Sequence, residues 1–293
     1  MGEKPVSDLN SGNDNKTGQH SPDKDLSVWK ERLWGVVAGV IATVLCSSIV
    51  LIKTHLDEQK YKIGNTIYLG RYEQNYPETN EPDPIEWYII SQNDGCYLLM
   101  SRYILEAGRY NNVREAVSWE KCSLRAWLNG EFLNSAFSGS ERRKIVSVNN
   151  TNPDNTVHNT SGGNATHDSV FLLSAEEAKQ YLTNETAFGL STDYAFFRGA
   201  RVTNPFGLQK KDEKYMAAHT VTSSDGHEFE FTHLLTKECF WLLRTPGSSQ
   251  EKVCRIYNSS YSDFYSGVGA FIDTDGVVVD GTLGIRPALW YKP

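Results

Sequence analysis

One uninterrupted apolar segment constrains this chain more than any other feature. Residues 33–52 read LWGVVAGVIATVLCSSIVLI and contain no charged side chain. A helix needs about 20 predominantly apolar residues to cross a hydrocarbon core of roughly 30 Å. Charges stand on both sides of the segment, with Lys30 and Arg32 before it and Lys53 after it. The sequence therefore predicts a transmembrane helix over Leu33–Ile52.

Two other interpretations of the segment are less consistent with its length and position. A secretory signal peptide has an apolar region of about 7 to 15 residues after a short basic start, whereas a long polar tail precedes this one. A buried core helix is the second alternative, and the flanking charges disfavour it. Gly35 and Gly39 have the GxxxG spacing that lets two membrane helices approach closely, so a weak homodimer through them is one expectation.

The segment divides the chain into parts of different composition. Residues 1–32 are a polar mixture with almost nothing apolar, and we expect a disordered tail. Residues 53–60 form a juxtamembrane linker, and 61–293 a folded domain. Basic residues flank both ends of the span, so their distribution hardly sets its orientation. A single uncleaved span after a short tail usually acts as a signal anchor, which places the N-terminus in the cytoplasm and the domain outside the cell membrane.

Composition limits what the domain does. The chain has 293 residues and a net charge of −7, which fits a globular protein with a core of ordinary size. Nucleic-acid binding normally needs a clustered basic surface to neutralise phosphates. We find no such cluster and do not expect a nucleic-acid partner.

Short strands and turns dominate after Tyr61. The stretch EWYIISQNDGCYLLMS, Glu86–Ser101, has two apolar runs around an Asp-Gly pair, which predicts a β-hairpin. A second hairpin is expected over Phe271–Val279, with its turn at Asp275 and Gly276.

Helices are indicated at two places, with a long polar loop between them. Ser118 is a candidate N-cap for a helix that breaks near Asn129-Gly130. The apolar run Val170–Leu173 is a predicted strand, and Ser174 and Glu177 after it have the spacing of a capping box. Residues 148–168, between them, are rich in turn formers, and loops of this length tend to be functional or mobile.

The order of seven motifs resembles a known domain family. They are YLGRYEQ, IEWYIIS, LLMSRYIL, SWEKCSLRAWLNGEFLNSAFS, DSVFLLSAEEAKQYL, WLLRTPG and GIRPALWY. This arrangement, over roughly Lys62–Lys292, is similar to the bacterial DUF6273 family. The resemblance implies an α+β, C-type-lectin-like domain of short antiparallel strands, two or three short helices and long loops. That fold group includes the formylglycine-generating enzyme.

Two departures limit what the resemblance implies. An additional leucine precedes Arg244 in WLLRTPG, and the copper-binding cysteine arrangement of formylglycine-generating enzyme is not evident. No activity is therefore carried over. The first and last strands lie side by side in such folds, which implies that Ile285–Tyr291 pairs near Asn65–Gly70. Pro287 then suits an edge or bulge. We expect structural roles for five residues: Trp127, Trp241, Arg244, Arg286 and Trp290.

Candidate reactive groups are few. Four cysteines lie outside the span, and a disulfide between Cys239 and Cys254 would close a short loop; buried thiols are the equal alternative. Neither CxxC, HExxH nor GxSxG is present. The sequence DTDG at 273–276 lacks the remaining ligands of a calcium loop, and the lectin triplets Glu-Pro-Asn and Gln-Pro-Asp are absent. We expect no metal, no cofactor and no catalytic residue.

An aromatic segment is the predicted ligand surface. In RIYNSSYSDFYSGVG, residues 255–269, aromatic anchors stand among small polar residues, a composition typical of recognition loops; an ordinary turn that packs its tyrosines on the core is the alternative. The anchors are Tyr257, Tyr261, Phe264 and Tyr265. The main hypothesis is a membrane-anchored domain that binds a protein or glycan. An enzyme on the same fold and an envelope scaffold are the other two.

Overall fold

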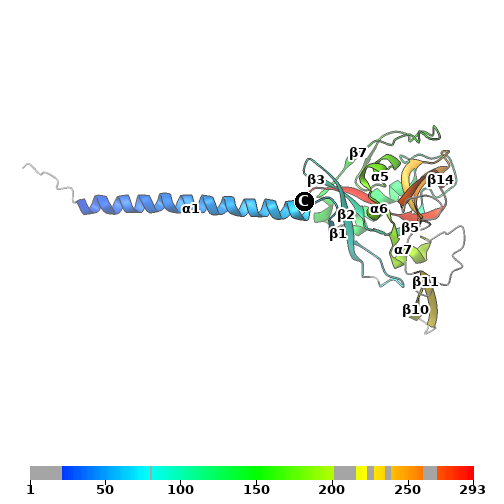
Figure 1. The fold of residues 1–293 in the computed structure, drawn as a ribbon, viewed down its shortest axis with the longest axis horizontal. Coiled ribbons are helices and arrows are strands. Elements are labelled where there is room, and N and C mark those ends of the chain that lie inside the picture. The colour runs from blue at the N-terminus through cyan, green and yellow to red at the C-terminus, as the bar shows by residue number, and fades with distance from the viewer. Residues whose placement is uncertain (1–21, 80, 201–215, 223–227, 235–238, 260–268) are drawn as a thin grey trace, which may run out of the picture. The chain divides into compact units, whose positions relative to one another are not determined.

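A computed structural model describes residues 22–79, 81–200, 216–222, 228–234, 239–259 and 269–293. The chain separates into two compact units, Met1–Gln59 and Lys60–Pro293. The first contains most of one long helix and the second is the domain (Figure 1).

The long helix, α1 (Pro22–Lys60), includes a stretch that is able to span a membrane. That stretch, Trp29–Leu56, has 28 residues; its most apolar part has a mean hydropathy of 2.5, and none of that part is buried. Exposed apolar side chains line it, so it is not a core helix of the domain. The helix is longer than the predicted span: residues 22–32 of the expected disordered tail and the expected linker 53–60 are helical.

The domain contains two five-stranded sheets. The first has the order β1 (Thr66–Tyr72), β2 (Asp83–Asn93), β3 (Cys96–Ser101), β16 (Ala288–Tyr291) and β6 (Ile145–Val146), and all its neighbours pair antiparallel. The second has the order β14 (Gly269–Val278), β13 (Lys252–Ser259), β12 (Trp241–Pro246), β15 (Thr282–Ile285) and β5 (Glu106–Arg109). Only β12 and β15 of this sheet pair in parallel.

The hairpin of β2 and β3 forms as the sequence predicted. Ile85, Trp87 and Ile89 are buried at alternate positions of β2, the period that one face of a strand requires. Asp94 and Gly95 turn the chain with φ values of 47° and 71°. Two left-handed residues match the twist of a two-residue hairpin loop, and they fix the register that places the apolar side chains in the core.

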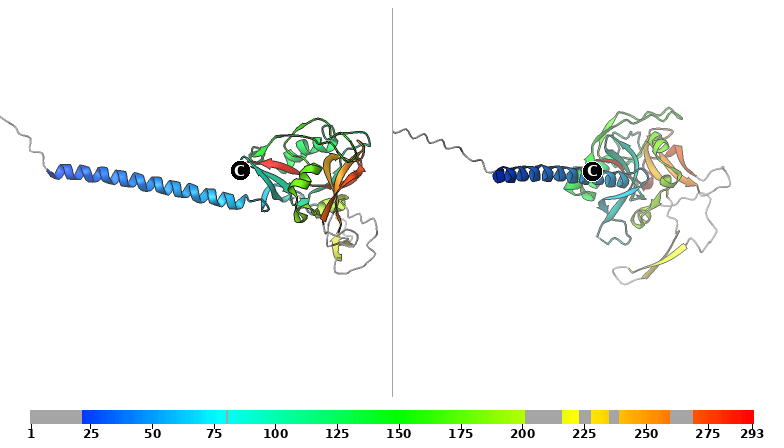
Figure 2. Two further views of the ribbon diagram at one scale, coloured as in Figure 1. Left: turned by 45° about the horizontal axis from the view of Figure 1, so that its top comes forward. Right: turned by 60° about the vertical axis from the view of Figure 1, so that its left-hand side comes forward.

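The segment LGIRPALWY joins the two sheets. Its first part lies in β15, which pairs with β5, and its last part forms β16, which pairs with β3 and β6. The expected pairing beside Asn65–Gly70 is therefore wrong, because β2 and β3 lie between β1 and β16. Figure 2 shows the red segment extending from the cyan strands to the orange strands. Pro287 lies at the crossover, where no ladder bond is required of it.

The second predicted hairpin is wrong as well. Residues 269–278 form one strand, β14, that pairs with β13 throughout. Asp275 and Gly276 lie in an irregularity of this ladder, and Gly276 has a φ of 80°. Its amide donates to Asp273 Oδ1 at 3.0 Å. An added Cβ there would lie 2.4 Å from the carbonyl oxygen of Val253, so glycine is required for the bulge and not for a turn.

The domain has more short helices than the two or three expected. They are α2 (Ser123–Trp127), the π-helical turn η1 (Leu128–Phe132), α3 (Leu133–Ala136), α4 (Gly139–Arg142), α5 (Ala175–Tyr181), α6 (Asn184–Ala187) and α7 (Asp193–Arg198). The capping box of Ser174 and Glu177 is confirmed at α5. Cys122, not Ser118, is the N-cap of α2, and the chain continues through Asn129-Gly130 as the π turn instead of breaking.

Three short ladders complete the part of the fold that the structure describes. They are β4 (Tyr103–Ile104) with β9 (Leu190–Ser191), β7 (Val148–Asn150) with β8 (Thr166–Asp168), and β10 (Met216–Thr222) with β11 (Glu228–Leu234). Val170–Leu173, predicted as a strand, makes only an isolated bridge between Phe171 and Ala288. One hydrophobic cluster includes both large sheets and the short helices α2 and α5. The described domain is thus a mixed α+β unit with a shared core.

Candidate functional site

A shallow basic pocket lies at the edge of the first sheet. Its volume is about 530 Å³, and its lining residues are Lys60, Gly64, Asn65, Thr66, Tyr88 and Arg102. Thr66 of β1 is paired with Tyr88 of β2, which brings a hydroxyl and a phenol to one side of the pocket. None of the six lining residues is a carboxylate, histidine or cysteine. The pocket therefore presents cations and neutral hydrogen-bonding groups, which suits the binding of an anion.

Arg102 is fixed in this pocket by two kinds of contact. Its Nη1 donates to Glu86 Oε1 at 2.8 Å, and this hydrogen bond raises the pKa of Arg102. The guanidinium lies 5.8 Å from the ring centre of Tyr88 and 5.4 Å from that of Tyr103. Its side chain is still 40% exposed. Among the described residues its side-chain hydrogen bonds use Nη1 alone, so Nε and Nη2 keep donors for a ligand.

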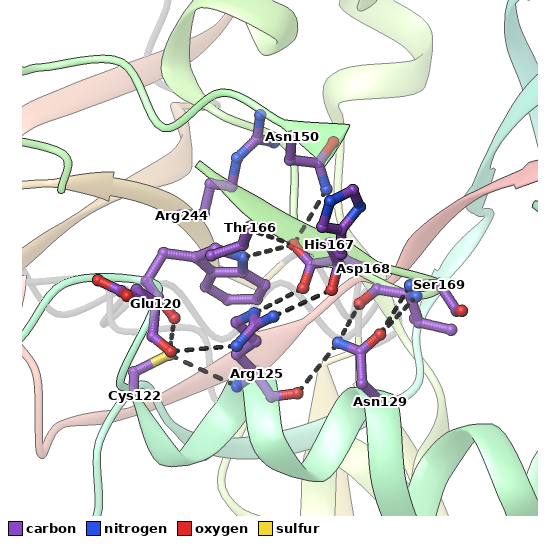
Figure 3. Close-up of polar contacts among 12 residues, drawn as sticks. Glu120, Cys122, Arg125, Asn129, Asn150, Thr166, His167, Asp168, Ser169 and Arg244 are labelled. Atoms are coloured by element: carbon purple, nitrogen blue, oxygen red, sulfur yellow. Dashed lines mark hydrogen bonds and ion pairs between the residues drawn. The ribbon is translucent and has the colours of Figure 1, made fainter. Parts of the chain in front are cut away.

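A buried carboxylate organises the polar loop between the two predicted helices. Asp168, at the end of β8, has no exposed side-chain surface and accepts from four groups. Arg125 Nε reaches Oδ1 at 2.6 Å; Trp119 Nε1, Thr166 Oγ1 and Asn150 Nδ2 reach Oδ2 at 3.0, 2.7 and 3.1 Å. Figure 3 shows Arg125, Thr166 and Asn150 converging on Asp168. These hydrogen bonds connect α2 to the β7–β8 ladder.

Asp168 is held as an anion by its hydrogen bonds. Burial is the largest influence and raises its pKa, but the bonds from Trp119, Thr166, Asn150 and Arg125 together lower it below the ordinary value. Both of its oxygens accept from protein groups, and its side chain has no exposed surface through which a substrate could reach it. Its role is structural, because a carboxylate that serves as a catalytic base must reach a reacting proton.

The Asp168 cluster predicts acid-sensitive stability. The folded pKa lies below the unfolded one, so its contribution is complete above the unfolded pKa and is lost as the pH falls through the folded pKa. Asp168→Asn should lower the free energy of unfolding at pH 7 by about 3 kcal/mol and flatten its pH dependence below about pH 4. Urea unfolding of the detergent-solubilised full chain at pH 7 and pH 3 measures both.

Asp94→Asn is the matched control for this prediction, since Asp94 is exposed in the β2–β3 turn and asparagine tolerates its positive φ. An equal loss of stability in both variants at pH 7 would contradict the assignment of the carboxylate's role to its buried contacts.

Arg244 lies at the centre of a second buried network. Its side chain is 1% exposed, and it forms a two-nitrogen ion pair with Glu177, in which Nη2 donates to Oε1 at 2.8 Å. Three further acceptors surround the guanidinium: the carbonyls of Leu172 at 2.7 Å and Thr151 at 3.0 Å, and Asn152 Oδ1 at 3.2 Å. The arginine thereby connects β12, α5 and the polar loop.

Arg286 is buried without a carboxylate partner among the described residues. Its guanidinium donates to the carbonyls of Ser101, Thr186, Phe188 and Arg102 at 3.1, 2.9, 3.4 and 3.0 Å. It lies 4.9 Å from the ring centre of Trp241. Burial lowers its pKa to about 9, so it stays charged at neutral pH. Trp241 is fully buried, and Trp127 and Trp290 are partly buried against the core.

The predicted aromatic ligand surface is described only at its beginning. Tyr257 lies in β13, where it pairs with Phe271 of β14. Tyr261, Phe264 and Tyr265 lie outside the described residues. The structure therefore does not test whether the four aromatic side chains form one surface.

Cys239 and Cys254 are free, buried thiols, which is the alternative to the possible disulfide between them. Cys254 is a free thiol whose Sγ donates to the carbonyl of Pro246 at 3.1 Å, and Cys239 Sγ donates to that of Ala200 at 2.8 Å. Burial raises the pKa of both Cys254 and Cys122 to about 12, which keeps these thiols protonated and unreactive. No group of three or more metal-ligating side chains gathers in the described parts of the chain.

The basic pocket could not be predicted from the sequence. Lys60 and Arg102 are 42 positions apart, and only the pairing of β1, β2 and β3 brings their elements to one sheet edge. Asp168 gave a weak signal as a charged residue two positions before the apolar run Val170–Leu173. Nothing in the sequence indicated that Trp119 and Arg125 would donate to it.

These features define an α+β domain that follows an exposed apolar helix in the chain and that contains a basic pocket and two buried arginine networks. A family match covers residues 94–293, more than half of the chain. The protein belongs to the family described as Domain of unknown function (DUF6273). The match begins in the β2–β3 turn, yet β1 and β2 pair in the same sheet as β3, so the folded unit is larger than the matched region. No curated protein and no solved structure matches the chain.

Proposed function

We propose that this protein is a single-pass membrane protein whose domain binds a protein or glycan and catalyses no reaction. The observation that carries the proposal is the exposed apolar stretch Trp29–Leu56 immediately before a folded domain. A water-exposed helix of this length and hydropathy would be costly in solution, whereas a bilayer accommodates it. The N-terminus is cytoplasmic and the domain extracellular in this proposal, and Gly35 and Gly39 support a weak homodimer.

The chemistry of the domain favours binding over catalysis. The buried ionisable groups Asp168, Arg244 and Arg286 direct their hydrogen bonds to protein acceptors and donors. The thiols of Cys122 and Cys254 are held protonated by burial. A bacterial origin, a C-type-lectin-like fold and ligand contact through residues 255–269 complete the proposal; the composition of that segment supports the last of these.

Photocrosslinking on intact cells tests ligand binding. With a photoreactive phenylalanine analogue in place of Tyr261, illumination should produce a discrete adduct of higher mass. The same analogue at Val113, which is 56% exposed, is the control and should give none. External protease should remove the domain from these cells. Equal adducts at both positions, or none at Tyr261, would contradict binding through the aromatic segment, and full protection from protease would contradict the orientation.

A further inference from the structure

We propose that the basic pocket at the edge of the first sheet binds a hexuronate, a sugar residue whose carboxylate lies between Arg102 and Lys60. The inference deepens the proposed function and rests on it, because it names an acidic glycan as the ligand of the domain. It uses none of residues 255–269, so the two sites can be tested separately. Every described lining residue belongs to the unit Lys60–Pro293.

The first lining residues are held in place by the sheet. Tyr61, next to Lys60, is 7% exposed and stacks on Tyr97 of β3 with the ring centres 4.9 Å apart. Asn65 Nδ2 donates to the carbonyl of Lys60 at 3.4 Å, and the carbonyl of Asn65 accepts from the amide of Ile89 at 2.9 Å. These contacts connect residues 60–65 to β2 and β3, so this side of the pocket is part of the domain.

Arg102 presents the edge of its guanidinium that suits a carboxylate. Its Nη1 is bound to Glu86, whereas Nε and Nη2 have no hydrogen-bond partner in the described part of the chain. These two donors lie side by side on the planar group and match the two oxygens of a carboxylate. The rings of Tyr88 and Tyr103, with centres 5.8 and 5.4 Å from the guanidinium, restrict its position before a ligand binds.

Positive charge exceeds negative charge around this edge. Glu86 offsets Arg102, and Lys60 adds a second cation to the lining. The buried Arg286 donates its Nη2 to the carbonyl of Arg102 at 3.0 Å, and it has no carboxylate partner among the described residues. A buried charge is screened less by salt than an exposed one, so its field adds to that of Lys60. The pocket therefore favours an anion over a neutral ligand of the same shape.

The remaining lining groups favour a sugar over an acidic peptide. Thr66 and Tyr88 are paired across β1 and β2, and their hydroxyls have no hydrogen-bond partner within the described residues. Such hydroxyls donate and accept, as those of a sugar do. None of the described lining residues is leucine, isoleucine, valine, methionine or phenylalanine, so a peptide would find no apolar contact beside its carboxylate. The volume of about 530 Å³ is typical of a small-molecule site.

Saturation-transfer NMR on the full chain tests this proposal. A polyoxyethylene detergent contributes neither charge nor sugar, and the buffer contains no phosphate. The probes are the methyl glycosides of glucuronate and of galacturonate, each compared with the neutral methyl hexoside of the same configuration. We expect at least one uronide to bind saturably and about tenfold more tightly than its neutral partner. Acetate and an acetylated tri-glutamate peptide should bind no more tightly than the neutral glycoside.

Substitutions determine whether the probe occupies the pocket. Arg102→Gln should weaken binding about tenfold, and Arg102→Lys nearly as much, because an ammonium keeps the charge but lacks two adjacent donors. Tyr88→Phe keeps the ring beside Arg102 and should weaken binding about threefold. The matched control is Arg114→Gln, since Arg114 is 58% exposed and paired with Glu251 outside the pocket. It should bind as the wild type does. Melting temperatures measured without probe show which variants are folded.

Four results would overturn the proposal. The first is the absence of saturable binding by either uronide. The second is equal binding of acetate or of the acidic peptide, which would make the pocket a general anion site. Wild-type affinity in both variants of Arg102 would place the sugar elsewhere, and an equal loss in Arg114→Gln would show attraction without a defined site. The adduct at Tyr261 involves none of these residues, so either experiment can fail while the other succeeds.

Discussion

Arg286→Met should lower the free energy of unfolding of the domain by about 5 kcal/mol, the largest effect that we expect from one substitution. The arginine donates to four backbone carbonyls in a site with no exposed surface. Methionine fills a similar volume but donates nothing, so these carbonyls would stay buried without their partner. Urea unfolding of the full chain in detergent, followed by near-ultraviolet circular dichroism, measures the loss.

The control for this substitution is Arg109→Met, which removes a guanidinium from an exposed position of β5. It should change stability by less than about 0.5 kcal/mol. Arg286→Lys distinguishes charge from geometry, because one ammonium cannot reach carbonyls that surround a planar guanidinium. A lysine variant as stable as the wild type would contradict the role that we assign to the four contacts.

The second large effect is expected at the pair of Arg244 and Glu177. Arg244→Met should cost about 4 kcal/mol, because it leaves a partly buried carboxylate and several acceptors without their donor. Glu177→Gln keeps an acceptor for the backbone of Ser174 and should cost about 1 to 2 kcal/mol. The double variant should lose less than the sum of the two, by about 1 to 3 kcal/mol.

Urea unfolding of the four chains in this cycle gives the coupling directly. The neighbouring Glu176→Gln is the matched control, since Glu176 is exposed on the same helix, and it should show no coupling to Arg244. If the double variant loses as much free energy of unfolding as the two single variants together, the interaction between Arg244 and Glu177 adds nothing to the contacts that each makes with other groups.

Local sequence signals predicted local structure well. The Asp-Gly turn of the β2–β3 hairpin and the capping box of α5 each depend on residues within a few positions of one another. The apolar span also predicted a helix correctly, although the helix continues beyond the span at both ends. Its extension through polar residues could not be expected, because polar helix formers carry no periodic signal of their own.

Contacts between residues that are far apart in the sequence could not be predicted. The Asp275-Gly276 pair was interpreted as a hairpin turn, but β13 offers a partner along the whole of β14 and absorbs the glycine as a bulge. The polar loop 148–168 was expected to be functional or mobile. Within this loop, Asn155 is bound to distant backbone: its Nδ2 donates to the carbonyls of Pro246 at 2.9 Å and Thr274 at 2.8 Å. Such contacts join residues that no local pattern relates.

The crossover at Arg286-Pro287 has a consequence for biosynthesis. Strands β15 and β16 belong to different sheets, and every other described strand precedes them in the chain. During synthesis, β5 and β12 therefore leave the ribosome before their partner β15, and β3 and β6 leave it before their partner β16. Until residues 282–291 emerge, both sheets have open edges of the kind that promote misassembly. The nascent domain therefore keeps these edges unpaired until β15 and β16 arrive.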